Sequence, residues 1–187
     1  MLSAHELILN TSPWVRRFAP LIPSGDPVLD LACGSGRHSQ LLAQLGHSVL
    51  AVDQDIVAVN ALQSPLITPK CLNLEQNDWP LSGLQFAGIV VCNYLYRPHI
   101  DHLVEMLQKN GVLIYETFAL GNEEFGKPSN PNFLLNPGEL LALAARHQLQ
   151  VIAYEDIYVD QPKPAMVQRL CAVNGGLKEH IPLQFQA

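Results

Sequence analysis

The chain has 187 residues, of which 48% are apolar and 15% charged, a composition typical of one globular domain and not of a disordered protein. Its net charge of −6, with lysines and arginines scattered along the sequence, argues against nucleic acid as a partner, because that binding depends on clustered cations. The cysteines and histidines show neither a metal-ligand spacing nor a redox pair, so no metal is predicted.

Short apolar runs alternate with amphipathic stretches, a pattern typical of strands joined by helices. Strands are predicted at residues 26–33, 47–53, 66–75, 84–93, 112–118, 149–159 and 165–175, and helices at 37–46, 55–63, 99–111 and 137–148. The alternation up to residue 118 predicts a parallel sheet with helices on both faces. The link between the last two strands is too short for a crossover, so we expect these strands to pair antiparallel.

Single residues mark the ends of several of these elements. Gly46 and Gly111 are predicted to end two of the helices as C-terminal caps. Asn136 is predicted to cap the start of the last helix, with Pro137 at its first position. Pro69 is expected to interrupt the third strand early, because proline cannot donate a main-chain hydrogen bond.

The stretch VLDLACGSGRHSQLLAQLGHSVLAVDQD, residues 28–55, places two glycines at the turn between the first strand and its helix. Without side chains, Gly34 and Gly36 let a ligand approach the main chain and let the turn take left-handed backbone angles. Asp53 ends the second strand, where a carboxylate accepts hydrogen bonds from both ribose hydroxyls of a nucleoside. The pattern predicts a nucleoside-containing ligand at the carboxyl ends of the strands.

Two classes of cofactor compete for such a site. A dinucleotide site favours glycine or alanine three residues after the second glycine, and that position holds Ser39. Asp30 would place a negative charge beside a pyrophosphate, whereas the ammonium group of S-adenosylmethionine (SAM) suits a nearby carboxylate. The charge pattern therefore favours SAM.

The segments VLDLACGSGRHS and AVDQD resemble the cofactor loop and the ribose-binding acid of class I SAM-dependent methyltransferases. They are similar in particular to the small bacterial branch that includes the tellurite-resistance methyltransferases, and the resemblance extends over most of residues 27–174. It implies an α/β fold with a doubly wound, mostly parallel seven-stranded sheet in the order 3-2-1-4-5-7-6. The last strand of that sheet is antiparallel, and helices cover both faces.

The resemblance also implies a role for each matching residue. Asp30 would lie near the methionine amino group, Asp53 would bind the ribose, and Asn73 stands where the family usually has an adenine-binding aspartate. The full set of implied SAM-binding residues is Asp30, Ala32, Gly34, Gly36, Arg37, Asp53, Gln54, Asn73, Leu74 and Asn93. Tyr94 and Arg97, beyond strand four, and Tyr115 and Glu116, at the end of strand five, are candidates for the substrate site. The alternatives are that Tyr94 packs beneath the following helix while Arg97 is solvated, and that alternation along strand five makes one of Tyr115 and Glu116 a core residue.

We predict a SAM-dependent methyltransferase with one domain over residues 1–187: a helical segment at 1–26, a core at 27–174, and a loop at 119–135 that covers a small-molecule acceptor. Methyl transfer requires alignment of the acceptor more than a dedicated base, so no catalytic residue is predicted. Two alternatives fit the same residues. One is a non-catalytic nucleoside-binding module, which Asn73 favours, and the other is an NAD-dependent dehydrogenase. The absence of a signal sequence or a long apolar run predicts a cytoplasmic protein without membrane contact.

Overall fold

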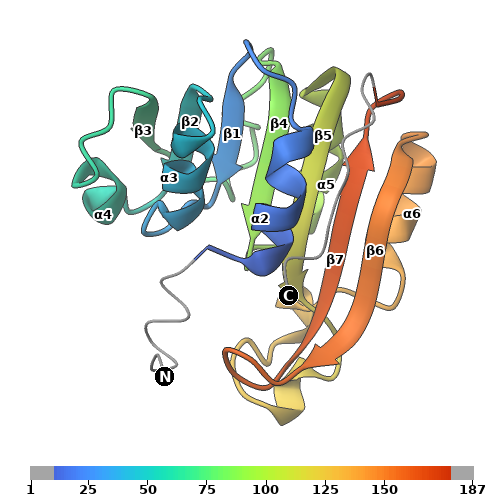
Figure 1. The fold of residues 1–187 in the computed structure, drawn as a ribbon. Helices are drawn as coiled ribbons and strands as arrows, with labels where there is room; N and C mark the ends of the chain where they lie inside the picture. Colours follow the sequence, from blue (N-terminus) through green and yellow to red (C-terminus); the bar gives the residue numbers. More distant parts are fainter. Residues whose placement is uncertain (1–10, 178–187) are drawn as a thin grey trace.

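The structure, a computed structural model, describes residues 11–177. A seven-stranded sheet in the order β3-β2-β1-β4-β5-β7-β6 forms its centre (Figure 1). The strands are β1 (Val28–Leu31), β2 (Val49–Asp53), β3 (Ile67–Cys71), β4 (Phe86–Cys92), β5 (Leu107–Phe118), β6 (Gln150–Val159) and β7 (Ala165–Val173). The first five strands pair in parallel, and β7 runs antiparallel to both β5 and β6. The predicted strand order and the antiparallel final pair are confirmed.

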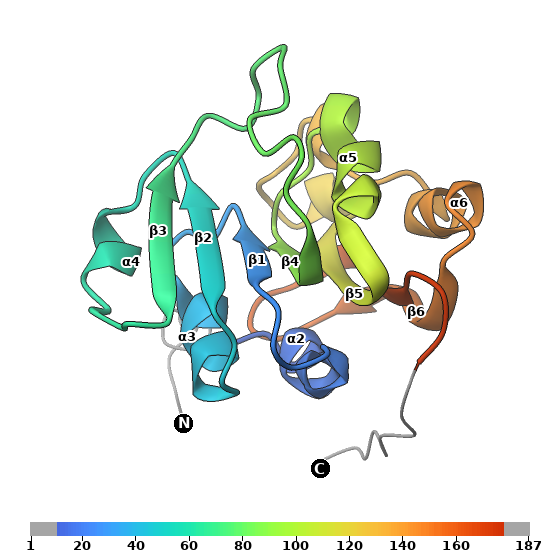
Figure 2. The ribbon, with the colours of Figure 1, turned by 90° about the horizontal axis from the view of Figure 1, so that it is seen from above.

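Helices cover both faces of this sheet. They are α2 (Pro13–Phe18), α3 (Arg37–Gln44), α4 (Val57–Asn60), α5 (Ile100–Glu105) and α6 (Glu139–Arg146), with 3-10 turns η1 (Ala19–Leu21), η2 (Arg97–His99), η3 (Asn122–Glu124) and η4 (Pro131–Phe133). Figure 2 shows α2 and α3 on one face, and α5 and α6 on the other. Every residue of β1 and β4 is buried, as expected for parallel strands that are covered on both sides.

The N-terminal part of the core is held by α2. Trp14 and Phe18 of this helix are buried against the sheet, and the side chain of Ser12 caps its first turn. The Ser12 N–H donates to Nε2 of His38 (3.2 Å). Burial lowers the pKa of His38 to about 3, so the ring stays neutral and accepts this bond. Residues 1–10 of the predicted helical segment lie outside the described residues.

The helix that begins at Arg37 ends as predicted. Gly46 has a φ of 90°, and its N–H donates to the carbonyl of Ala43 (3.0 Å) while the N–H of His47 donates to that of Leu42 (3.1 Å). This pair of bonds is a Schellman motif, which glycine favours at its left-handed position. The expected helix at 55–63 is shorter, with α4 limited to Val57–Asn60.

Proline does not interrupt the third strand. The strand β3 continues through Pro69, which pairs with Ala51 of β2. Because β3 lies at the edge of the sheet, one side of its main chain has no strand partner, and the missing N–H of proline is tolerated there. The expected interruption at Pro69 was therefore wrong.

The predicted helix at 99–111 is also wrong in its second half. The helix α5 ends at Glu105, and β5 begins at Leu107, which pairs with Phe86 of β4. Gly111 is therefore not a helix cap. It lies inside β5, where a Cβ would come within 2.9 Å of the carbonyl oxygen of Gln108, so glycine is required by close main-chain approach.

The start of the last helix differs from the prediction as well. The N-cap of α6 is Gly138, with a φ of 72°, and not Asn136. The side chain of Asn136 donates to the carboxylate of Glu139 (2.9 Å), and so does its main-chain N–H (2.8 Å). The capping contact thus runs from the residue before the helix to an acid within it.

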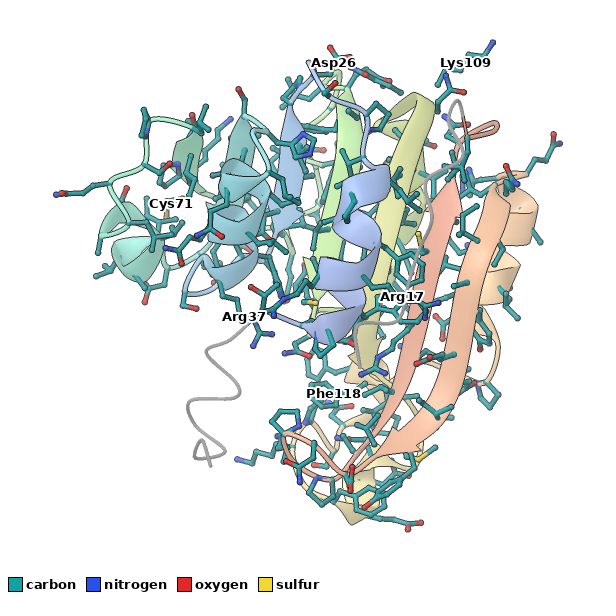
Figure 3. All side chains as sticks on the ribbon, in the orientation of Figure 1. Arg17, Asp26, Arg37, Cys71, Lys109 and Phe118 are labelled. Atoms are coloured by element: carbon teal, nitrogen blue, oxygen red, sulfur yellow. The ribbon has the colours of Figure 1, made fainter. Side chains whose placement is uncertain are left out.

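The carboxyl ends of the parallel strands lie at one end of the molecule. Figure 3 shows Arg37 and Phe118 at this end, while Asp26 and Lys109 lie at the opposite end. The loop at 119–135 and the turn between β6 and β7 lie at the same end as Phe118 (Figure 1). Within residues 11–177, no helix has both the length and the apolar character that are needed to cross a bilayer.

Candidate SAM and acceptor site

The turn between β1 and α3 is built from left-handed residues. Ala32, Gly34 and Gly36 have φ values of 53°, 53° and 77°, which an ordinary side chain disfavours. The turn is tied back to the sheet, because the Cys33 N–H donates to the carbonyl of Val52 on β2 (3.0 Å). The main chain of this β1–α3 turn is therefore held by a contact within the protein.

The two glycines of the turn have different surroundings. Gly34 is exposed, and a Cβ added there would meet nothing within 4 Å. Gly36 is buried, and a Cβ there would come within 2.7 Å of Val59 Cγ2 and 2.8 Å of Leu62 Cδ1. Gly34 thus leaves open space for a ligand, whereas Gly36 lets α3 pack closely against the α4 region.

Asp53 lies at the end of β2 with its carboxylate turned toward the β1–α3 turn. One oxygen accepts a hydrogen bond from the Gly34 N–H (2.8 Å), and the other accepts one from the Asp55 N–H (3.1 Å). A carboxylate has about four acceptor positions, so two remain for other donors. The side chain is only half-buried, and these positions are compatible with the two hydroxyls of a ribose.

Asp30 lies beneath the turn and is fully buried. Its carboxylate accepts a hydrogen bond from Oγ of Ser39 on α3. Burial raises its pKa to about 6, although the bonds from Ser39 and the charge of Arg37 act in the opposite direction. Sequence reasoning considered Ser39 only as a departure from the dinucleotide pattern, whereas in the fold it supports the acid beneath the turn.

The ends of β2 and β3 bring Gln54 and Asn73 together. Oδ1 of Asn73 accepts hydrogen bonds from Gln54 Nε2 (3.3 Å) and from the Glu75 N–H (2.9 Å). Both lone pairs of this oxygen are thus in use. The oxygen could accept a hydrogen bond from adenine only if the bond from Gln54 were broken. The side chain of Leu74 is buried in the core, which leaves only its main chain available to a ligand.

A pocket of about 240 Å³ opens beyond Asn93, at the carboxyl ends of β4 and β5. Asn93 has a φ of 56°, and its N–H donates to the carbonyl of Glu116 (2.9 Å). The residues that line the pocket are Glu75, Asn93, Tyr94, Leu95, Thr117, Phe118, Pro128 and Phe133. Two of them, Pro128 and Phe133, come from the loop at 119–135.

Among the four substrate candidates, Tyr94 is the one that lines this pocket. Tyr115 is buried in the core below it, and its hydroxyl donates to the carbonyl of Tyr94 (2.9 Å). Glu116 follows Tyr115 on the strand and so lies on the opposite face, where its carboxylate forms an ion pair with Arg169. Tyr115 therefore supports the pocket from behind, while Glu116 pairs with Arg169 and does not line the pocket.

Arg97 holds the loop at 119–135 in place. Its guanidinium forms a two-bond ion pair with Glu139 on α6 (2.7 and 2.8 Å). It also donates to the carbonyls of Asn132 (2.8 Å) and Leu134 (2.6 Å), the neighbours of Phe133. Arg97 thus fixes the main chain on both sides of a residue in the pocket wall.

Both ends of the same loop are joined to each other. Ala119 and Leu135 form an isolated parallel bridge, in which the Leu135 N–H donates to the carbonyl of Phe118 and the Leu120 N–H to that of Leu135, each at 2.9 Å. The Ala119 N–H donates to Met166 on β7 (2.9 Å). The loop therefore leaves and returns at one place, beside the end of β5.

Several pocket residues were not predicted from the sequence. Thr117 and Phe118 directly follow the predicted Glu116, so extending the strand end by two residues would have found them. Phe133 lies in the loop that was predicted to cover the site. Glu75 had no comparable signal as part of the acceptor pocket. Within residues 11–177, no three His, Cys, Asp or Glu side chains group closely enough to hold a metal ion.

The sequence of this chain is similar to those of known proteins. A family model described as "Tellurite resistance protein TehB" matches residues 18–112. The chain is 33% identical over 122 residues to a tRNA U34 carboxymethyltransferase from Alcanivorax borkumensis, covering 58% of this chain and 38% of that relative. The chain therefore spans well under half the length of this curated relative.

Solved structures share the fold. TehB from Haemophilus influenzae superposes with a TM-score of 0.67 at 18% identity, covering 85% of this chain and 61% of that chain. A 1,6-didemethyltoxoflavin-N1-methyltransferase from Burkholderia thailandensis, solved with its substrate and S-adenosylhomocysteine, gives a TM-score of 0.62 at 15% identity and covers 88% and 79% of the two chains.

The two glycines of the turn are expected to differ in their effect on stability. Gly36→Ala adds steric conflict to left-handed strain, and we expect it to lower the free energy of unfolding by about 2–5 kcal/mol. Gly34→Ala introduces strain alone and is expected to cost about 1–2 kcal/mol. Urea denaturation measures both values, and equal losses would contradict the packing assigned to Gly36.

The buried Asp30 predicts a defined dependence of stability on pH. Its folded pKa of about 6 exceeds the ordinary 3.8, so its contribution to stability is full below pH 3.8 and is lost as the pH rises through 6. We expect the stability of Asp30→Asn relative to the natural protein to rise by on the order of 2–3 kcal/mol from pH 4 to 7. The exposed Asp78→Asn provides the control, and a rise of similar size there would refute the assignment.

Loss of the Arg97 side chain is expected to loosen one wall of the pocket. In Arg97→Gln, amide hydrogens of residues 131–139 should exchange about tenfold faster or more, because the bonds to Glu139 and the two carbonyls are lost. Arg146 lies on α6, as Glu139 does, and forms a more exposed ion pair with Asp101 of α5. Arg146→Gln should leave the exchange of residues 131–139 unchanged. Mass-spectrometric hydrogen exchange makes the comparison, and unchanged exchange in Arg97→Gln would show that the loop is held by other contacts.

Proposed function

Because the chain belongs to the TehB family of class I SAM-dependent methyltransferases, we propose that it transfers a methyl group from SAM to a small organic acceptor. SAM is the cofactor of this family. The observation that carries the proposal is the 2.8 Å hydrogen bond from the Gly34 N–H to Asp53, beside open space at Gly34. This corner offers bare main chain and a half-buried acid to a nucleoside.

Different residues of this corner are proposed to bind different parts of SAM. The two remaining acceptor positions of Asp53 suit the ribose hydroxyls, and the main chain of Gly34 leaves room for the sugar. Asp30 provides negative charge beneath the turn, toward the ammonium group of the methionine part. Arg37, at the start of α3, is proposed to face the carboxylate of the same part. Asn93 stands between this cofactor region and the pocket.

When bound, SAM supplies an electrophilic methyl group on a cationic sulfur, so the protein needs no nucleophile of its own. The chain contributes alignment and the exclusion of water. Tyr94, Phe118 and Phe133 form walls around the acceptor space, and Arg97 keeps Phe133 in position from outside. We propose that the loop at 119–135 covers the acceptor during transfer.

A tRNA acceptor, suggested by the name of the A. borkumensis relative, has less support. The match covers only 38% of that relative, and this chain has a net charge of −6 without a basic cluster, whereas binding to phosphates depends on cations. The pocket of about 240 Å³ is smaller than the roughly 300–1,000 Å³ of sites for drug-sized ligands. A small molecule fits it best.

We also propose that residues 27–174 form one core domain and that the protein acts in the cytoplasm. A single sheet, from β1 to β7, supports one core. All four cysteines lie within the described residues and are unpaired, which supports a reducing compartment.

Binding of S-adenosylhomocysteine and transfer of label test the proposed function. By calorimetry we expect the product nucleoside to bind with a Kd below about 1 mM, and Asp53→Ala to bind at least about tenfold more weakly, because charge-assisted hydrogen bonds are lost. Asp55→Asn, at the same strand end, is the control with little expected change. With methyl-labelled SAM and a metabolite extract, label should enter an acceptor above the level without enzyme.

Four outcomes would count against this function. Absence of S-adenosylhomocysteine binding would exclude the cofactor site, and normal binding by Asp53→Ala would show that the acid is not part of it. Binding without any transfer of label would favour the non-catalytic module. An NADH titration that changes the fluorescence of the protein would favour the dehydrogenase.

A further inference from the structure

The pocket beyond Asn93 is lined mostly by uncharged residues. Its one charged residue is Glu75, and three of its members carry aromatic rings, which are Tyr94, Phe118 and Phe133. A carboxylate beside aromatic faces favours ligands that carry positive charge or hydrogen-bond donors. The same groups disfavour a negatively charged ligand.

Tyr94 has a hydroxyl group that is buried without a hydrogen-bond partner. Burial raises the pKa of this hydroxyl, and the negative charge of Glu75 raises it further. A buried hydroxyl without a partner is costly, and because almost none of the surface of this oxygen is accessible, the pocket is lined by other atoms of Tyr94 and not by its hydroxyl.

Two cations lie close to this region without lining the pocket. The guanidinium of Arg97 is held by Glu139 and two main-chain carbonyls. The exposed Lys163 places its ammonium 5.5 Å from the centre of the Phe118 ring and donates to the carbonyl of Lys127 (3.5 Å). In the described part of the chain, the lining of this pocket contains no Lys or Arg.

From this wall we propose that the acceptor is a small organic amine with a flat, apolar body, and that oxyanions are excluded. The proposal rests on the proposed function and specifies its substrate class. The amine donates N–H bonds to Glu75, and its body packs between the aromatic rings. A tellurite oxyanion would face the negative charge of Glu75 with no cation in the lining to offset it.

The transfer step follows from the chemistry of an amine. The ammonium form first loses a proton to Glu75 or water, which leaves a lone pair on nitrogen. This lone pair forms the new bond from nitrogen to the methyl carbon while the bond from sulfur to that carbon breaks. The sulfur keeps the bonding electron pair and becomes neutral, and the positive charge moves to the methylated nitrogen, which can then release a further proton to water.

Calorimetry on the full chain saturated with S-adenosylhomocysteine tests this selectivity. The probes are tryptamine, a cationic amine, and indole-3-propionate, which has the same ring system and a negative charge; inorganic tellurite is the third probe. We expect tryptamine to bind at least about tenfold more tightly than indole-3-propionate, and tellurite to give no measurable heat of binding.

Substitutions assign the selectivity to named groups. Glu75→Gln should weaken tryptamine binding about tenfold and bring its affinity close to that of indole-3-propionate. Tyr94→Phe keeps the aromatic ring and should leave tryptamine binding unchanged, while keeping or raising the Tm because the unpartnered hydroxyl is removed. Glu124→Gln, an exposed acid in the loop at 119–135, is the matched control and should bind both probes as the natural protein does.

Any of the following results refutes the inference. Indole-3-propionate or tellurite binds as tightly as tryptamine or more tightly, tryptamine does not bind, or Glu75→Gln keeps the preference for tryptamine. Binding of S-adenosylhomocysteine is measured first. If it is absent, the proposed function fails as well, whereas its presence without selectivity for the amine refutes only the substrate class.

Discussion

The hydrogen bond between the Gly34 N–H and the Asp53 carboxylate joins the ends of two neighbouring strands, and the arrangement of the site depends on it. The turn after β1 is left-handed at three residues, which main-chain strain alone would disfavour. Register between β1 and β2 brings Asp53 to this turn, and its charge stabilises an exposed main-chain donor. A nucleoside would therefore meet a corner that is already formed.

The strands themselves were predictable because they depend on local patterns, whereas their order in the sheet followed from the family resemblance. Each buried strand is a short apolar run bounded by turn residues, and Gly46 ends α3 in the way that its sequence indicates. The boundary between α5 and β5 was not predictable in this way, because Leu103 and Leu107 fit both a helical period and a buried strand. This boundary depends on a contact between residues that are distant in sequence, in which the Asn110 N–H donates to the carbonyl of Asn174 (2.6 Å).

The same distinction between local and distant contacts applies to the site. The cofactor corner lies within one continuous segment, so its glycines and acid were visible together. The acceptor pocket combines four separate segments, and the partner of Arg97 is 42 residues away in the sequence. Strand alternation showed that Tyr115 and Glu116 must face opposite sides, but only the tertiary structure shows which of them lies beneath the pocket.

The bridge between Ala119 and Leu135 has an evolutionary consequence. Because the intervening loop is closed at its base, changes in its interior need not disturb the end of β5 or the cofactor corner. Insertions or exchanges within this loop would alter Pro128, Phe133 and their neighbours while the hydrogen bond between Gly34 and Asp53 is kept. The closed base thus separates the loop from the corner at Gly34 and Asp53, which would allow related chains to exchange one short segment without changing that corner.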